Sequence, residues 1–237
     1  MRLRFGSFAA SQWARGFLRN CRNVMKPLVT DVSDVESRIR RQAQVLFDAK
    51  VAALPDKKGR LILAMCSLVL AAFRELEHDL KETAVAYDAV RQSFAMTYPA
   101  PMVWLFRVWL WFYGDPVKEL QRRSMAKTGR RMYGRSMEFD EEKTDDTAEM
   151  LITRCAYHEF FASHGAPELT LLVCAWDRVW MDAVDRSPRP VRTERPSTIS
   201  TGGDCCRFRF IRDAEKAGKD PGDIVLVQLH PLAAKKQ

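Results

Sequence analysis

The stretch that decides the fold runs from Ile152 to Phe210. It begins ITRCAYHEFFASHGAPELTLLVCAWDRVWMDAV, passes through a basic link that contains prolines, and ends RTERPSTISTGGDCCRFRF. Most of the chain's cysteines and half of its histidines fall inside it: Cys155, Cys174, Cys205, Cys206, His158 and His164. Because thiols and imidazoles act as nucleophiles, proton carriers and metal ligands, we expect any chemistry of this protein to take place here.

The residues in and around this stretch predict two helices and a small antiparallel sheet. The segments with strand-like patterns are residues 147–154, 191–200, 206–212 and 223–229. The segments with helical patterns are residues 156–165, which end at Gly165, and residues 169–184, which follow Pro167 and Glu168. A turn that contains Gly202 and Gly203 joins two of the strands as a hairpin.

The N-terminal half of the chain reads as helical. Apolar residues mark one face of residues 33–51, and residues 61–94 read as one long helix that begins with a buried apolar run. The acidic run at residues 138–146 reads as a surface loop. We therefore predict an α+β fold, in which a helical N-terminal half packs on a small antiparallel sheet with two helices in the C-terminal half.

The predicted domain organisation is a basic, amphipathic N-terminal extension, residues 1–30, ahead of a single α+β domain, residues 31–237. The domain has a helical part, residues 31–146, and a cysteine-containing α+β part, residues 147–237. The extension has no acidic residue. Such a start is typical of an organelle transit peptide or a membrane-surface helix, and it also fits a frayed helix or leader residues.

Composition narrows the class of protein and its partners. The 47% hydrophobic and 29% charged residues are ordinary for a globular protein. The net charge of +8 attracts anionic surfaces, but basic and aromatic residues do not alternate as in a stacking platform, so we expect no nucleic acid partner. No signal peptide is recognisable, and the adjacent Cys205 and Cys206 disfavour a disulfide, so we expect reduced thiols in the cytoplasm.

The tryptophan-rich segment at residues 102–113 has two interpretations. Its apolar residues surround the expected helix, but the segment is short and contains Arg107, which argues against a membrane span. Packing in the core or in a homo-oligomer is one interpretation. A lid over an apolar pocket or a peripheral membrane contact is the other, and residues 1–30 offer a second place for such a contact.

The cysteines allow a catalytic and a structural interpretation. Cys174 and Asp177 are three residues apart on one predicted helix face, and His158 on the preceding helix would complete a thiolate–imidazole–carboxylate set. Spacing alone favours the plainer interpretation of three packed cysteines and a capped aspartate. The chain has no Cys-x-x-Cys motif, so spacing does not indicate zinc either.

The order of motifs resembles the bacterial L-2-amino-thiazoline-4-carboxylic acid hydrolase family. The resemblance rests on Cys155 with Tyr157, on Gly165-Ala166-Pro167-Glu168-Leu169, on Cys174-Ala175-Trp176-Asp177, on Arg195 ahead of Thr198, and on residues 202–210, GGDCCRFRF. It is close from Cys155 to Phe210 and loose in the upstream helices. In this alignment Cys206 fills the family position, and Cys205 is an extra thiol.

The resemblance implies a hydrolase that opens 2-aminothiazoline-4-carboxylate, a small-molecule substrate, to carbamoyl-cysteine on a bacterial route to L-cysteine. The catalytic residues that it implies are Cys174, Asp177, His158, Cys155 and Cys206, and the substrate-binding residues are Arg195, Gly203 and Asp204. Cys174, or water beside it, would attack the ring, His158 and Asp177 would transfer protons, and Arg195 would pair with the carboxylate.

Two alternatives accompany this expectation. The reaction as written needs no cofactor, but Cys155, Cys174 and Cys206 could instead surround a divalent metal that activates water. The tryptophan-rich segment and residues 1–30 exceed what a minimal hydrolase requires. The competing hypothesis is therefore a non-enzymatic, sensor-like module that binds a small molecule or a metal at a membrane surface.

Overall fold

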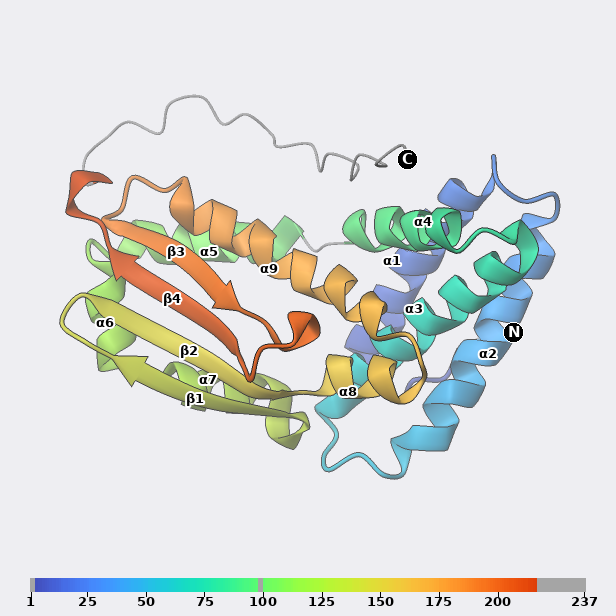
Figure 1. Cartoon of the computed structure of the whole chain (residues 1–237), viewed down its shortest axis with the longest axis horizontal. Coiled ribbons are helices and arrows are strands. Elements are labelled where there is room, and N and C mark those ends of the chain that lie inside the picture. The colour runs from blue at the N-terminus through green and yellow to red at the C-terminus, as the bar shows by residue number, and fades with distance from the viewer. Residues whose placement is uncertain (1–2, 98–99, 217–237) are drawn as a thin grey trace.

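The computed structural model of the chain describes residues 3–97 and 100–216 and has a helical half and a sheet half (Figure 1). The helical half contains α1 (Phe8–Met25), α2 (Val32–Val51), α3 (Gly59–Leu80) and α4 (Thr83–Ala95). The sheet half contains α5 (Ala100–Phe112), α6 (Pro116–Arg122), α7 (Met125–Tyr133), β1 (Met137–Lys143), β2 (Thr147–Cys155), α8 (Ala156–Ser163), α9 (Thr170–Asp185), β3 (Val191–Ser197) and β4 (Cys206–Arg212). The α+β prediction is confirmed.

Helix α3 is the centre of the helical half. Its apolar run from Ile62 to Phe73 is buried, as the sequence predicts, and α1, α2 and α4 pack around it. Helix α1 belongs to the same core, because Phe17 and Met25 are fully buried and Ser7 caps its first turn. The expectation of a frayed N-terminal helix is therefore wrong.

The long helix predicted over residues 61–94 is two helices. Lys81 adopts a left-handed conformation with φ 57°, and its amide donates to the Glu77 carbonyl, which closes α3. Glu82 is extended, and α4 begins at Thr83. The charged residues that surround the break continue the helical spacing, so the pattern alone does not show it.

The sheet is antiparallel throughout, with the strand order β1-β2-β4-β3. The predicted hairpin of β3 and β4 is confirmed, and Gly202 in its turn has φ +90°. The strand predicted at residues 223–229 lies outside the described residues.

Strand β1 corrects the prediction of an acidic surface loop and places a strand in the part predicted to be helical. Met137 and Phe139 are buried, whereas Glu138 and Asp140 between them are exposed. The period of two is that of a half-buried strand. Gly129 of α7 allows the close packing, because a β-carbon there would lie 2.6 Å from the Phe139 ring. The many charged residues of this segment make its strand pattern hard to recognise in the sequence.

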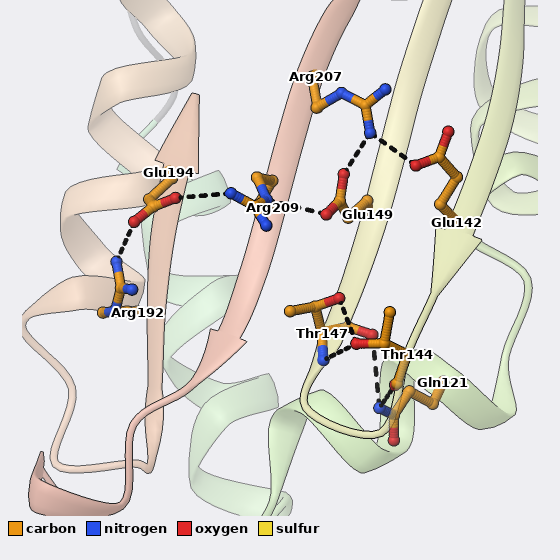
Figure 2. Close-up of polar contacts among 9 residues, drawn as sticks. All are labelled: Gln121, Glu142, Thr144, Thr147, Glu149, Arg192, Glu194, Arg207 and Arg209. Atoms are coloured by element: carbon orange, nitrogen blue, oxygen red, sulfur yellow. Dashed lines mark hydrogen bonds and ion pairs between the residues drawn. The ribbon is translucent and has the colours of Figure 1, made fainter. Parts of the chain in front are cut away.

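The two faces of the sheet have opposite character. Helices α6, α7 and α9 pack on one face, where Phe208 and Phe210 contact the Trp180 ring at centroid distances of 5.6 and 5.7 Å. The other face carries a row of alternating charges that crosses all four strands (Figure 2). We call this row the ionic ladder, and it consists of Arg192, Glu194, Arg209, Glu149, Arg207 and Glu142.

A candidate active site between α9 and the hairpin

Arg195 of β3 joins the helix to the hairpin. Its Nη1 donates to the Cys174 carbonyl at 2.9 Å and lies 3.4 Å from Oδ2 of Asp177. Its guanidinium carbon lies 4.8 Å from the centroid of the Phe208 ring. The side chain is therefore held by a carbonyl, a carboxylate and an aromatic face, the three groups that a guanidinium binds best.

Cys206 begins β4 and is buried beside Arg195. Its Sγ accepts the Ile199 amide at 3.4 Å and lies 4.0 Å from Nη2 of Arg195. Burial raises the pKa of the Cys206 thiol, and these two donors only partly oppose that effect. The thiol is therefore protonated at neutral pH, and its position suits a structural or proton-donating role better than nucleophilic attack.

Cys174 of α9 faces a cluster of hydroxyl groups. Its Sγ lies 3.3 Å from Oγ of Ser200, which in turn lies 2.9 Å from Oγ1 of Thr198. Unlike Cys206, Cys174 is only half-buried. Accessibility and a neighbouring proton carrier are what a nucleophilic thiol requires, so Cys174 fits that role best of the predicted cysteines.

Cys155 lies at the end of β2, close to the other two thiols. Desolvation is the main cause that raises its pKa to about 12, and negative charge on Cys206 and Cys174 contributes. Folding thus brings the three predicted cysteines into one neighbourhood. Within residues 3–97 and 100–216, however, no three His, Cys, Asp or Glu side chains have the geometry to hold a metal ion. The metal-centre alternative stays a prediction.

Asp177 lies one turn after Cys174 on α9. The Trp180 indole donates to its Oδ1 at 3.2 Å, and Arg195 approaches its other oxygen. Desolvation raises the pKa of Asp177, and Arg195 and Trp180 oppose this only in part. The side chain is nevertheless 34% exposed, so it is crowded by protein atoms on one side and reached by water on the other. This combination suits a carboxyl group that exchanges protons with a substrate or with water.

His158 does not join the thiol and carboxylate contacts. Its Nδ1 lies 3.4 Å from Oγ1 of Thr170, at the start of α9, and among the described side chains this is its hydrogen-bond partner. The predicted thiolate–imidazole–carboxylate set is thus not assembled in this arrangement. The backbone amide of His158 instead faces Cys155, where it partly offsets the rise in the pKa of that thiol.

Gly203 and Asp204 lie in the hairpin turn. The Gly203 amide donates to the Thr198 carbonyl at 3.0 Å, and a β-carbon at this position would meet the same oxygen at 3.0 Å. Gly203 therefore allows the turn to close over Thr198. Asp204 is exposed. The two residues shape the turn, and their substrate-binding role stays a prediction.

The sequence motifs included Thr198, but the other hydroxyl groups and one tyrosine of this region were not predicted. Thr198, Ser200 and Thr201 form one hydrogen-bonded cluster beside Cys174. Desolvation raises the pKa of Tyr133 of α7 to about 12, and the negative charge on Asp177 also raises it, so the two side chains interact electrostatically. The run STIST before the glycines was a signal for the first group, whereas Tyr133 comes from a distant segment and gave none.

We call the set Cys174, Asp177, Arg195, Ser200 and Cys206 the arginine–thiol site. A shallow surface depression elsewhere in the molecule is lined by Asp115, Lys118, Gln121, Lys143, Thr144, Asp145 and Arg212. It lies at the β1–β2 turn, where Gln121 donates to the Thr144 carbonyl (Figure 2). Its lining contains no thiol or imidazole, so the arginine–thiol site is the better candidate for catalysis.

The fold and this site together define an α+β protein with a thiol-, carboxylate- and guanidinium-containing centre. Residues 114–210 match the model of the L-2-amino-thiazoline-4-carboxylic acid hydrolase family, which confirms the resemblance over that part of the chain. The match ends at Phe210 and includes every member of the arginine–thiol site. Searches of curated proteins and of solved structures give no match.

The helices of the described residues give one further finding about membranes. Within residues 3–97 and 100–216, none of them combines the length and the apolar character needed to cross a bilayer.

Proposed function

We propose that the protein is a hydrolase that opens the ring of a small cyclic amidine of the 2-aminothiazoline-4-carboxylate type. The observation that carries the proposal is the arginine–thiol site within the matched residues 114–210. A partly accessible thiol, a carboxyl group with a raised pKa and a guanidinium lie around one another there. These are the groups that such a reaction requires.

The reaction adds one water across the C2–sulfur bond. The nucleophile attacks the amidine carbon C2, the bond from C2 to the ring sulfur breaks, and the sulfur leaves with a proton as a free thiol. The water oxygen ends on C2 as the carbonyl of carbamoyl-cysteine, and the second proton of water ends on the former ring nitrogen. If Cys174 attacks first, it forms a covalent adduct at C2, and water then releases Cys174 unchanged.

The roles follow from exposure and proton affinity. Cys174 attacks, or orients the attacking water, because it is partly accessible and lies 3.3 Å from the Ser200 hydroxyl. Desolvation raises the pKa of the Cys155 and Cys206 thiols, which makes them poorer nucleophiles. Asp177 gives a proton to the leaving sulfur and takes one from water, which its raised pKa favours. His158 can assist only if its ring turns away from Thr170.

Arg195 binds the substrate carboxylate in this scheme. Its Nη1 is shared by the Cys174 carbonyl and Asp177, while its buried Nε has no hydrogen-bond partner among the described residues. A buried donor without an acceptor is costly, and a ligand carboxylate would satisfy it. Protonation of Asp177 would also free the guanidinium to bind that carboxylate.

We further propose that the enzyme works with reduced thiols in the cytoplasm and needs no cofactor. All six cysteines are free in the structure. An oxidising compartment would expose Cys174 to reactions that destroy a nucleophilic thiol.

Mass spectrometry of the product tests this function. Purified protein incubated with L-2-aminothiazoline-4-carboxylate should form carbamoyl-cysteine, and Cys174→Ala should abolish its formation. Cys205→Ala is the matched control, because Cys205 is a half-buried thiol in the same hairpin that faces Ser197. No product from the wild type with this substrate and related cyclic amidines, together with saturable binding of one of them, would favour the non-enzymatic module.

A further inference from the structure

Helix α5 presents an apolar face that the rest of the described chain does not cover. Four large side chains on this face are more than half exposed: Trp104 (62%), Leu105 (58%), Trp111 (71%) and Phe112 (67%). On a helix with about 3.6 residues per turn, Trp104 and Trp111 fall on one line, with Leu105 and Phe112 beside them. The expectation that this segment is buried in the core therefore holds for only part of it.

The opposite side of α5 fixes the helix to the sheet half. Leu110 is buried in a cluster with Val184 and Val191, and α5 packs along α9. Arg189 donates to the carbonyls of Leu110 and Trp111 at 2.8 and 2.7 Å, which anchors the C-terminal end of the helix. The exposed aromatic residues thus stand on a firmly held helix, and their exposure is a property of the fold.

The charge of this face is positive. Arg107 is exposed and lies beside Trp104 and Trp111 on the helix surface. The sequence has no acidic residue between Asp88 and Asp115. Asp115 itself caps α6 and forms an ion pair with Arg212 at 3.1 Å. The face therefore combines tryptophan, phenylalanine and leucine with an arginine, which is the composition of helices that lie in a lipid interface.

We propose that this exposed face of α5 binds the surface of a membrane that contains anionic phospholipids. The aromatic rings would enter the headgroup region, where tryptophan is favoured, and Arg107 would pair with lipid phosphate. A second copy of the chain fits less well. A two-fold contact through this face would place two Arg107 side chains in one interface without an acidic partner from residues 89–114.

Vesicle flotation of the full chain tests this proposal without reference to enzymatic activity. Wild type should float with vesicles of mixed phosphatidylcholine and phosphatidylglycerol, and Trp104→Ser/Trp111→Ser should lower the bound fraction at least about tenfold. Phe8→Ser is the matched control, because Phe8 is a 77% exposed aromatic residue on α1, and it should float like wild type. Arg107→Gln should weaken binding to the anionic vesicles and leave binding to pure phosphatidylcholine unchanged.

Two results would overturn the proposal. One is that the wild type does not float with the vesicles, or that Trp104→Ser/Trp111→Ser floats as the wild type does. In the second case, a loss of flotation in Phe8→Ser would show that residues 1–30 bind the vesicles. The other is a wild-type dimer in sedimentation velocity that Trp104→Ser/Trp111→Ser converts to a monomer without vesicles, which would make the face a self-association surface.

Discussion

The two faces of the sheet differ in composition, although the same strands form both. On β4, Cys206, Phe208 and Phe210 point toward the helices, whereas Arg207 and Arg209 between them join the ionic ladder (Figure 2). The helix-covered face combines the apolar core with the arginine–thiol site. The ladder face stays half-exposed. It places Glu149 and Glu194 between two arginines each, whereas Glu142 at its edge pairs with Arg207.

The difference shows where changes of sequence should matter. Arg195, beneath α9, contacts side chains of α9 and β4 and is placed to control the candidate chemistry. Arg207 and Arg209 on the ladder are about a third exposed, and each has a second carboxylate that can replace a lost partner. The following substitutions test this contrast, beginning with the largest expected effect.

Phe208→Ala should lower the free energy of unfolding by about 3–5 kcal/mol. Phe208 is 1% exposed and contacts the Trp180 ring and the Arg195 guanidinium, so the substitution leaves a cavity in the covered face. Urea denaturation followed by circular dichroism measures the loss. Ile211→Ala, on the half-exposed ladder face of the same strand, should cost less than about 1.5 kcal/mol. Equal losses would remove the distinction between the faces.

Arg195→Lys should lower kcat/KM for the cyclic amidine by about 100-fold or more. An ammonium cannot replace the guanidinium contacts to the Cys174 carbonyl, to Asp177 and to a bidentate carboxylate. The matched control is Arg192→Lys, on the same strand but in the ladder, and it should keep wild-type kinetics. Equal activity of the two variants would contradict the role of Arg195 in binding the substrate.

Glu149→Gln should lower the free energy of unfolding at neutral pH by about 1–2 kcal/mol. The side chain is 9% exposed and accepts from Arg207 at 2.5 Å and from Arg209 at 2.8 Å. This loss of stability is smaller than for a fully buried ion pair, because both arginines are about a third exposed and can be hydrated when the carboxylate is removed.

The pH dependence of the Glu149→Gln effect has a definite sign. Burial alone would raise the pKa of Glu149, but Arg207 and Arg209 outweigh it and lower the pKa. A carboxylate with a lowered pKa stabilises the fold above its unfolded pKa of about 4.3, and that stability is lost as the pH falls through the folded pKa. The stability gap between wild type and Glu149→Gln should therefore narrow below about pH 4. A constant gap would show that the charge is not responsible.

Glu142→Ala should change the free energy of unfolding least, by less than about 0.5 kcal/mol. Glu142 is 58% exposed and lies at the edge of the ladder, where Arg207 keeps Glu149 as a second partner. The same denaturation experiment in high salt should erase the small difference. A loss as large as that for Glu149→Gln would show that the ladder acts as one cooperative unit.

Local patterns were enough to predict much of the fold. Residue spacing predicted the strand that leads to Cys155, and turn chemistry predicted the helix end at Gly165 and the glycine turn of the hairpin. The structure contains all three features. The shared helix face of Cys174 and Asp177 could be predicted for the same reason, since three residues make nearly one turn.

Other features depend on contacts that spacing does not show. Lys81 ends α3 in the left-handed conformation, which glycine adopts more readily than other residues, so the sequence does not indicate this helix end. In β1, acidic residues alternate with the buried Met137 and Phe139, so the segment resembles a charged loop. The partner of His158 proved to be Thr170, because a side chain chooses among neighbours that only the packing of α8 on α9 brings together. Ser200 reached Cys174 in the same way.

The most direct test of the account is the rate of carbamoyl-cysteine formation in ¹⁸O-labelled water, measured for wild type and Cys174→Ala. Wild type should place the label in the carbamoyl group, and the folded Cys174→Ala variant should form no product above the rate without enzyme. Product formation by Cys174→Ala at the wild-type rate would contradict the assignment of the chemistry to the arginine–thiol site.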